Sequence, residues 1–287
     1  MLAQILVNGI ILGGLYACIA SGFSLVWGVL NIINILHGSF IVLGSYLAYF
    51  AHAQLGIHPF ISILFIAPFF FVLGWLLQAG IINRVIGAPI LITLTLTFGL
   101  DLMLGNSLLL AFTADYRKLT LDPPLGQLVL GTMSIPLDRL YAMVLAFLLT
   151  GLLYLLMTRS RIGRAIVAVR MDREAAALMG VPVARVYAIT FGIGALMAGA
   201  AGVLLAVIFP ISPLVSGSYL GKAFVTCVLG GLGSVPGAIV GGIALGMAES
   251  FGALWFGSEY ATTVAFTLLI LMLLVRPTGL MGKKGYE

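Results

Sequence analysis

The stretch LGKAFVTCVLGGLGSVPGAIVGGIALGMAESFGALWF, residues 220–256, decides how this chain folds. It is apolar and rich in glycine, and its only charged side chains are Lys222 and Glu249. Its centre reads GGLGSVPG, from Gly230 to Gly237, where Pro236 interrupts a continuous helix. We expect two short membrane helices that meet at this turn. Irregular backbone of this kind is tolerated at membrane depth only where protein or a water-filled cavity surrounds it.

The rest of the chain has the composition of a membrane protein. Of its 287 residues 62% are hydrophobic and 8% are charged, and the first charged side chain is Arg84. The apolar runs are continuous, which favours helices of ~20 residues over the short alternating strands of a β-barrel. We therefore predict an all-α polytopic membrane protein with about eight membrane-spanning helices, including the broken glycine-rich hairpin. Besides that hairpin, the expected spans are residues 4–27, 38–56, 59–80, 89–112, 138–158, 186–208 and 260–276.

The termini and the small residues add two expectations. The first apolar run lacks a basic segment before it and is longer than the core of a signal peptide, so we interpret it as an uncleaved span. Small residues recur at intervals of helix packing, which predicts close helix contacts. They are Gly9 with Gly13, Gly194 with Ala198 and Gly202, and Gly233 with Gly237 and Gly241.

The arginines predict the orientation of the chain. Residues 159–185 carry six arginines against Asp172 and Glu174, whereas the loop at 113–139 balances its basic and acidic residues. Positive loops stay in the cytoplasm, so the first loop is expected inside and the second outside. Arg84 then falls inside, and Lys283 and Lys284 place the C-terminus inside as well.

This orientation requires the glycine-rich region to enter the membrane and return. Span 186–208 leaves the cytoplasm and span 260–276 comes back to it, so the segment between them begins and ends outside. The hairpin satisfies this condition, and its Lys222 and Glu249 are expected to pair across it in a structural role. Broken membrane helices often line transport pathways.

A second interruption lies between Trp27 and Phe40, where Asn31, Asn34 and His37 break apolar sequence without a charged loop. It is either a plain turn between helices or a discontinuity inside the membrane that lends polar groups to a transport pathway. The side of the N-terminus stays open for the same reason. Counting spans back from Arg84 puts it outside, but a re-entrant first region would reverse that result.

The arginine-rich loop contains a short helix with its own start and stop signals. Asp172 is suited to cap a helix from Arg173 to Met179, Glu174 favours its first turn, and Gly180 favours the left-handed conformation that ends it. An isolated helix of two turns is marginal in water, and Ala175, Leu178 and Met179 form one small apolar face. This pattern indicates a partner protein. The competing interpretation is a solvated loop whose arginines only set the topology.

At this point the chain resembles the permease subunits of ABC importers of the branched-chain amino acid type. EAAALMGVP at 174–182, preceded by GRAIVAVRMDR and followed by FGIGALMAGAAGVL, is similar to their coupling loop. Three further stretches resemble the family in the expected order, and residues 83–138 carry no distinctive signature. These stretches are NGIILGGLYACIASGFSLVWGVLNIINILHGSF at 8–40, GKAFVTCVLGGLGSVPGAIVGG at 221–242 and EYATTVAFTLLILMLLVRPTGLMG at 259–282.

The resemblance implies a single permease domain over residues 1–287, with a cytoplasmic coupling loop at 159–185, in the bacterial inner membrane. Its short helix would dock on a cytoplasmic ATPase, with Glu174, Ala175 and Gly180 on the family's motif. The implied partners are two ATPase subunits, a second related permease subunit and an external solute-binding protein. ATP and magnesium would bind the ATPases, because this chain has no Walker A motif. Lys222 and Glu249 also match positions where the family carries Lys and Glu.

The solute is not named by the sequence. A branched-chain or related amino acid is expected from the resemblance, but urea, amides and aromatic acids stay open because the binding protein would select the solute. Asp101 lies mid-span and is either a hydrogen-bonded packing residue or part of the pathway. No metal site, cofactor or nucleic-acid partner is expected, and Cys18 and Cys227 are expected to pack in apolar surroundings.

Two other classes of function were weighed. An ion-coupled secondary transporter would use broken helices and Asp101, but would leave the capped cytoplasmic helix unexplained. An intramembrane serine hydrolase is suggested by HGSF at 37–40 and GLGSVPG at 231–237. A nucleophile needs a base within hydrogen-bond reach, and neither Ser39 nor Ser234 has a sequence context that supplies one. Transport by an ATP-driven permease is the function that the sequence favours.

Overall fold

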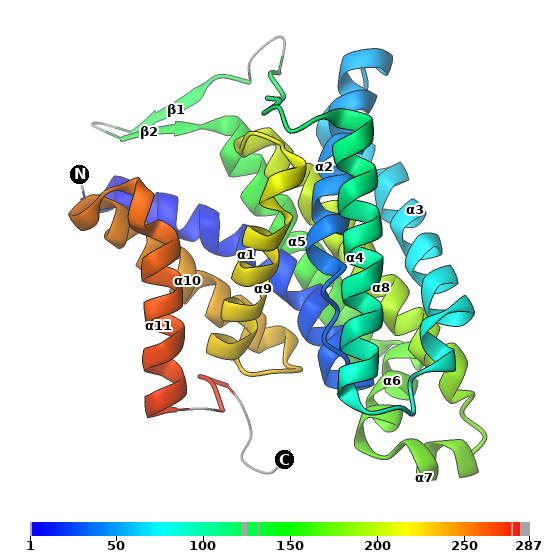
Figure 1. Cartoon of the computed structure of the whole chain (residues 1–287). Coiled ribbons are helices and arrows are strands. Elements are labelled where there is room, and N and C mark those ends of the chain that lie inside the picture. Colours follow the sequence, from blue (N-terminus) through cyan, green and yellow to red (C-terminus); the bar gives the residue numbers. More distant parts are fainter. Residues whose placement is uncertain (1, 122–124, 131–132, 277, 282–287) are drawn as a thin grey trace.

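The protein is a helical bundle, seen here in a computed structural model that describes residues 2–121, 125–130, 133–276 and 278–281 (Figure 1). The membrane helices alternate in direction, and two short helices and one β-hairpin lie at opposite ends of the bundle. In chain order the elements are α1 (Leu2–Leu30), α2 (His37–Leu55), α3 (Pro59–Gly80), η1 (Ile82–Arg84), α4 (Ile90–Phe112), β1 (Gln127–Leu130), β2 (Met133–Pro136), α5 (Leu137–Arg159), α6 (Arg161–Met171), α7 (Arg173–Leu178), α8 (Val183–Ile208), η2 (Pro213–Val215), α9 (Ser216–Gly230), α10 (Val235–Phe256), η3 (Ser258–Tyr260) and α11 (Ala261–Val275).

The predicted fold class, an all-α polytopic membrane protein, is confirmed. Within the described residues, six helices are long and apolar enough to cross a membrane: α1, α3, α4, α5, α8 and α10. Helix α11 is apolar but shorter, and α2 and α9 do not meet the same criterion. The expected count of about eight is therefore approximate, because α2, α9 and α11 fall outside this criterion of length and composition.

The two ends of the bundle differ in what they carry. The N-terminus lies beside the β-hairpin, where Gln4 Nε2 donates to the Ser134 carbonyl and the Ser134 amide donates back to Gln4 Oε1. Helices α6 and α7 lie at the opposite end (Figure 1). The side of the N-terminus, open in the sequence, is therefore the side of the 113–139 loop. Lys283 and Lys284 lie outside the described residues.

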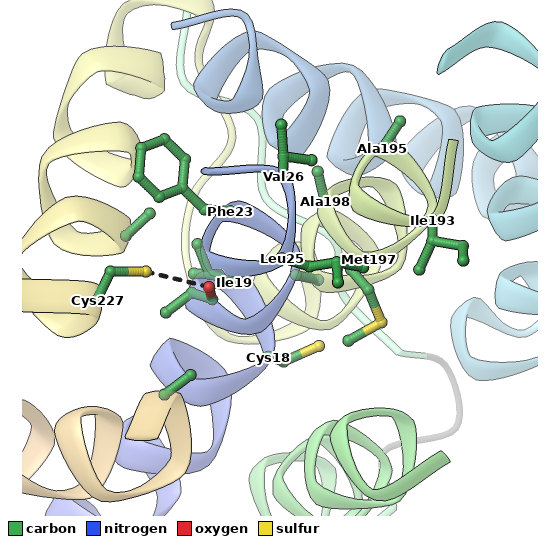
Figure 2. Packing of buried hydrophobic residues seen from close by; sticks show 14 of the residues in the cluster. Cys18, Ile19, Phe23, Leu25, Val26, Ile193, Ala195, Met197, Ala198 and Cys227 are labelled. Carbon is green, nitrogen blue, oxygen red and sulfur yellow. Dashed lines mark hydrogen bonds between the residues drawn. The ribbon is translucent and has the colours of Figure 1, made fainter. Parts of the chain in front are cut away.

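The core forms around α1 and α8, which pack against each other and against most other helices. Helix α8 is buried over nearly its whole length. Figure 2 shows side chains of both helices side by side, with Val26 of α1 near Ala198 of α8 and Leu25 of α1 near Met197 of α8, while Phe23 points toward α9. Cys18 and Cys227 are fully buried free thiols, and Cys227 Sγ donates to the Ala20 carbonyl at 3.2 Å (Figure 2). Both cysteines therefore pack as expected.

Glycines bring α1 and α10 into backbone contact. A Cβ added to Gly246 would lie 2.4 Å from both the Gly9 carbonyl oxygen and the Gly13 amide nitrogen, and one added to Gly242 would lie 2.6 Å from the Gly13 oxygen. Such distances leave no room for a side chain. The close helix packing predicted from Gly9 and Gly13 is present here, as is that of Gly194 against Gly22 and Gly202 against Ile41.

Helices α9 and α10 form the expected hairpin, and its tip lies within the predicted turn at Gly230–Gly237, but Pro236 does not itself break the helix. The backbone leaves the helix at Gly231–Ser234, and Pro236 lies in the first turn of α10. The amide of a residue in the first turn has no partner within the helix, so proline is tolerated there. Ser234 Oγ caps α10 by accepting from the Gly237 amide at 3.1 Å.

Two elements were not predicted from the sequence. Helix α6 lies where only a charged loop is expected from the sequence. Its Gly163, Ile166 and Val169 recur at helical spacing and are buried, while Arg161 and Arg164 face outward. The antiparallel β1–β2 hairpin, with Leu128 opposite Ile135, lies in a loop that carried no clear strand signal. Each element is too short for its pattern to stand out from the surrounding sequence.

Candidate coupling loop and transport pathway

The candidate coupling loop, residues 159–185, contains α6 and α7, which share Asp172. This residue is extended, with φ −157° and ψ 109°, so it ends α6 and begins α7. Asp172 Oδ1 accepts from the Glu174 amide at 2.8 Å and from the Ala175 amide at 3.0 Å. The predicted cap is therefore present, and it satisfies two of the amides that a helix start leaves without a partner.

The end of α7 also follows its sequence signals. Met179 closes the helix, Gly180 has φ +82°, and the Val181 amide donates back to the Ala176 carbonyl at 3.0 Å. A left-handed residue with such a backward bond is the usual way for a helix to stop. The observed helix is Arg173–Leu178, one residue shorter than expected.

The apolar side chains of α7 divide into two sets. Ala176 is buried against the bundle, whereas Leu178 and Met179 are 89% and 84% exposed. Arg173, Glu174 and Ala175 are exposed as well. The helix is thus held to its own chain by its cap and by Ala176, and it presents Ala175, Leu178 and Met179 outward at one end of the bundle. Exposed leucine and methionine side by side are a feature of protein-binding surfaces.

A cavity of about 380 Å³ lies next to the coupling loop. Its walls come from the end of α1, the connection between α3 and α4, the end of α6, the start of α7 and α8. Asn31, Thr93, Arg170, Asp172, Arg173 and Tyr187 are among the residues that line it. The loop and the first break in the membrane helices therefore line the same cavity.

That first break is an irregular segment packed within the bundle. Helix α1 ends at Leu30, Asn31 has φ +54°, and α2 begins at His37. His37 Nε2 donates to the carbonyl of Ile19, which lies well inside α1, so the chain runs back along α1 before α2 starts. Thr97 Oγ1 of α4 donates to the Ile33 carbonyl within the segment at 2.9 Å. Residues 31–36 are therefore a discontinuity between helices, not an exposed loop.

Two of the three polar side chains at this break, Asn34 and His37, are buried, whereas Asn31 is exposed. Asn34 is 1% exposed, and neither its amide oxygen nor its amide nitrogen has a hydrogen-bond partner among the described residues. His37 is fully buried, and its Nδ1 also has no partner there. Burying a polar group without a hydrogen bond costs about 1–3 kcal/mol, so such groups are usually retained for a reason other than stability.

Among the described residues, no hydrogen bond joins Asp101 to Asn34 or to His37. Asp101 is half-buried on α4, and its Oδ1 accepts from Ser39 Oγ at 2.5 Å. Ser39 is therefore bonded to a carboxylate and not to a histidine, while Ser234 Oγ serves as a helix cap. Among the described residues, neither serine donates to a histidine, so the Ser–His pair common in serine hydrolases is not formed.

The glycine-rich hairpin carries a buried polar triad. Lys222 Nζ of α9 lies 3.1 Å from Glu249 Oε2 of α10, the ion pair expected from the sequence. Tyr16 of α1 was not anticipated: its hydroxyl donates to Glu249 Oε2 at 2.5 Å and accepts from Lys222 Nζ at 2.7 Å. A lone tyrosine in an apolar run gives no sign of a partner more than two hundred residues away. The triad joins α1, α9 and α10.

The sequence is similar to known membrane transport proteins, in agreement with the bundle of membrane helices described above. The family model described as the branched-chain amino acid transport system permease component matches residues 5–275. The chain belongs to this permease family. The permease interpretation of the sequence is therefore confirmed, and the fold described above is that of a family member. No solved structure shows significant similarity to the chain.

Individual members of the permease family are similar over nearly their whole length. The high-affinity branched-chain amino acid transport system permease protein BraD of Pseudomonas aeruginosa is 37% identical over 99% of this chain and 97% of that protein. The corresponding protein LivH of Escherichia coli K12 is 37% identical over 99% of this chain and 96% of its own length. A probable branched-chain amino acid transport permease protein of Methanocaldococcus jannaschii is 27% identical over 97% of this chain.

Proposed function

We propose that this chain is the membrane subunit of an ATP-driven importer that carries branched-chain amino acids into the cytoplasm. The observation that carries the proposal is α7, a capped helix that exposes Leu178 and Met179 at the arginine-rich end of a transport permease. An exposed helix of this kind is suited to fit a cleft of a second protein. The named relatives supply the class of solute.

The partners in this proposal are the two ATPase subunits, a second related permease subunit and an external solute-binding protein. The ATPases bind ATP and magnesium, and this chain needs no cofactor of its own. Residues 1–287 act as one permease domain, with 159–185 as its coupling loop. Asp172, Arg173, Glu174, Ala175, Leu178, Met179 and Gly180 form the part that docks on the ATPase.

The proposed orientation puts the coupling loop and the C-terminus in the cytoplasm of a bacterial cell and the β-hairpin outside the inner membrane. The six arginines of 159–185 support it, because positive loops are retained inside. The start of α1, where Gln4 is hydrogen-bonded to Ser134 of the β-hairpin, would then face outward, toward the binding protein.

The transport pathway in this proposal follows the irregular segment after α1. Asn31, Asn34 and His37 would offer polar atoms to an amino acid, and Asp101 would border the route from α4. The two amide atoms of Asn34 and Nδ1 of His37, buried without partners among the described residues, support this assignment. Lys222, Gly233, Pro236, Gly237 and Glu249 would keep the hairpin in shape beside it.

The first test is to solubilise the full-length tagged chain from its native membrane in mild detergent and to identify the proteins that co-purify. Recovery of ABC ATPase subunits and a second permease supports the importer. Recovery of the chain alone, with solute uptake in liposomes driven by an ion gradient, would instead establish a secondary transporter, in which Asp101 is the first residue to test.

A matched pair of substitutions locates the docking surface. Leu178→Asp places a charge on the exposed face of α7, and Val129→Asp places one on the β-hairpin at the other end of the bundle, where Val129 is also exposed. The first variant is expected to lose the ATPase subunits during purification and the second to keep them. Glu174→Arg and Gly180→Pro are expected to leave the amount of permease in the membrane unchanged but to abolish ATP-dependent uptake. ATPase recovery with Leu178→Asp equal to that of Val129→Asp would remove α7 as the docking helix.

A further inference from the structure

Arg170 connects the coupling loop to a distant part of the chain. It lies in the last turn of α6, two residues before the Asp172 cap of α7. Its Nη1 donates to the carbonyl oxygen of Gly233 at 2.7 Å, across a sequence separation of 63 residues. Gly233 belongs to the turn between α9 and α10. The guanidinium therefore joins the loop to the tip of the glycine-rich hairpin.

The backbone of the tip is shaped to receive this guanidinium. Gly233 has φ +75°, a conformation that glycine adopts without strain. A Cβ added there would lie 2.7 Å from Arg170 Nη2 and 3.1 Å from Arg170 Cζ. Any larger residue would therefore push the arginine away from the carbonyl that it binds.

The tip is also in contact with the end of α1. A Cβ added to Gly28 would lie 2.5 Å from the Gly233 Cα, so the two backbones touch without side chains between them. Gly233 thus lies between α1 on one side and the guanidinium of α6 on the other. Farther along, the hairpin is tied to α1 again by Tyr16, Lys222 and Glu249.

The packing of α6 makes this contact distinctive. The main neighbours of α6 are α5, α7, α8 and α1. The Arg170 side chain reaches past these helices to the hairpin. A charged donor on a carbonyl oxygen is a stronger bond than one between neutral groups. It is also directional, so a shift of α6 must either carry the tip with it or break the bond.

We propose that Arg170 is the positioning residue through which movement of the ATPase-bound coupling loop is transmitted to the α9–α10 hairpin. This inference rests on the proposed function, in which α7 docks on the ATPase. A displacement of α7 passes through Asp172 to the end of α6, and Arg170 delivers it to Gly233. Because Gly233 abuts Gly28, the hairpin and α1 then move relative to the irregular segment that follows α1. This is a physical connection between two sites through one bond and one backbone contact.

The competing role for Arg170 is that its charge only sets the topology of the loop. Three variants separate the two roles. Arg170→Met keeps the length of the side chain but removes the donor and the charge, and Arg170→Lys keeps the charge while losing the fork of donors. Arg161→Met is the matched control, since it removes a charge from the exposed face of the same helix.

The experiment uses the complete importer in liposomes, supplied with ATP and radiolabelled leucine. Uptake of leucine per ATP hydrolysed is expected to fall at least about tenfold in Arg170→Met, to fall less in Arg170→Lys, and to stay at the wild-type value in Arg161→Met. Equal ratios of uptake to hydrolysis in Arg170→Met and the wild type would overturn the proposal. So would an equal loss in Arg161→Met, which would point to charge alone.

A second measurement follows the tip directly and does not depend on uptake. Leu232, beside Gly233, is 41% exposed, so Leu232→Cys is open to a water-soluble thiol reagent. Its rate of labelling is expected to change when ATP is added to the otherwise wild-type complex and to stay constant when Arg170→Met is also present. A rate that responds to ATP in both backgrounds, or in neither, would overturn the proposed relay. Failure of the wild-type chain to retain ATPase subunits would instead reject the proposed function itself.

Discussion

Replacing Lys222 by methionine is expected to destabilise the bundle sharply, because it breaks a buried ion pair from one side. The substitution removes the two bonds of Nζ, at 2.7 Å to the Tyr16 hydroxyl and at 3.1 Å to Glu249 Oε2. Among the described residues, Glu249 is left with one donor, the Tyr16 hydroxyl. The Glu249 side chain is only 4% exposed, so water cannot replace what is lost.

The size of the effect follows from the burial of the two partners. Removing one partner of a buried pair costs about 3–5 kcal/mol, and the 17% exposure of the Lys222 side chain favours the lower end. A loss of about 3 kcal/mol corresponds to a melting temperature lower by ~6 °C, at roughly 2 °C for each kcal/mol in a large domain. The double variant Lys222→Met with Glu249→Gln is expected to recover most of this loss, to within about 1 kcal/mol of the wild type. The neutral amide that Glu249→Gln introduces can still accept a hydrogen bond from the Tyr16 hydroxyl.

The chain contains its own probes for this measurement. Its two cysteines, Cys18 and Cys227, are fully buried in α1 and α9, so a thiol-reactive fluorophore reacts with them only when the bundle opens. Fluorescence is followed during heating of the full-length chain in detergent, for the wild type, both single variants and the double variant. The reasoning is refuted if the losses of the single variants simply add in the double variant, because uncoupled residues behave in that way.

Three further outcomes are expected. Asp172→Ala removes the acceptor of two amides and should cost about 0.5–2 kcal/mol of local helix stability, seen as faster hydrogen exchange in α7 with little change in the melting temperature of the bundle. Gly246→Ala should lower the melting temperature, because the added Cβ would lie 2.4 Å from two backbone atoms of α1. Gly151→Ala, whose Cβ would have nothing within 4 Å, should leave it unchanged. Equal effects of the two substitutions would show that the contact between Gly246 and α1 does not stabilise the bundle. Asn34→Leu removes a buried amide without partners among the described residues, so the free energy of unfolding should stay level or rise by up to about 1–3 kcal/mol. Uptake of leucine should fall in the same variant. Unchanged uptake would exclude Asn34 from the pathway.

Local chemistry explains why much of this protein was predictable from its sequence. The membrane helices follow from long apolar runs, and the ends of α7 follow from Asp172 and Gly180, because a cap and a left-handed glycine act on residues within four positions. The Lys222–Glu249 pair was accessible for a related reason: two opposite charges in one apolar hairpin have few other partners. Short signals were harder to detect, and α6 was missed because its arginines obscured three apolar residues at helical spacing.

The sequence by itself determined that the chain is an all-helical membrane protein with a capped helix in an arginine-rich loop, because hydropathy, capping and charge depend on neighbouring residues, and its resemblance to a known family added the permease assignment. Only the tertiary structure decided which distant groups meet. Tyr16 joins the ion pair, Arg170 reaches Gly233, and the segment after α1 turns back along that helix to leave Asn34 buried. Each of these contacts depends on how the helices pack. Helices α1 and α10 pack through glycines on both helices, so their approach depends on two distant segments of the sequence together.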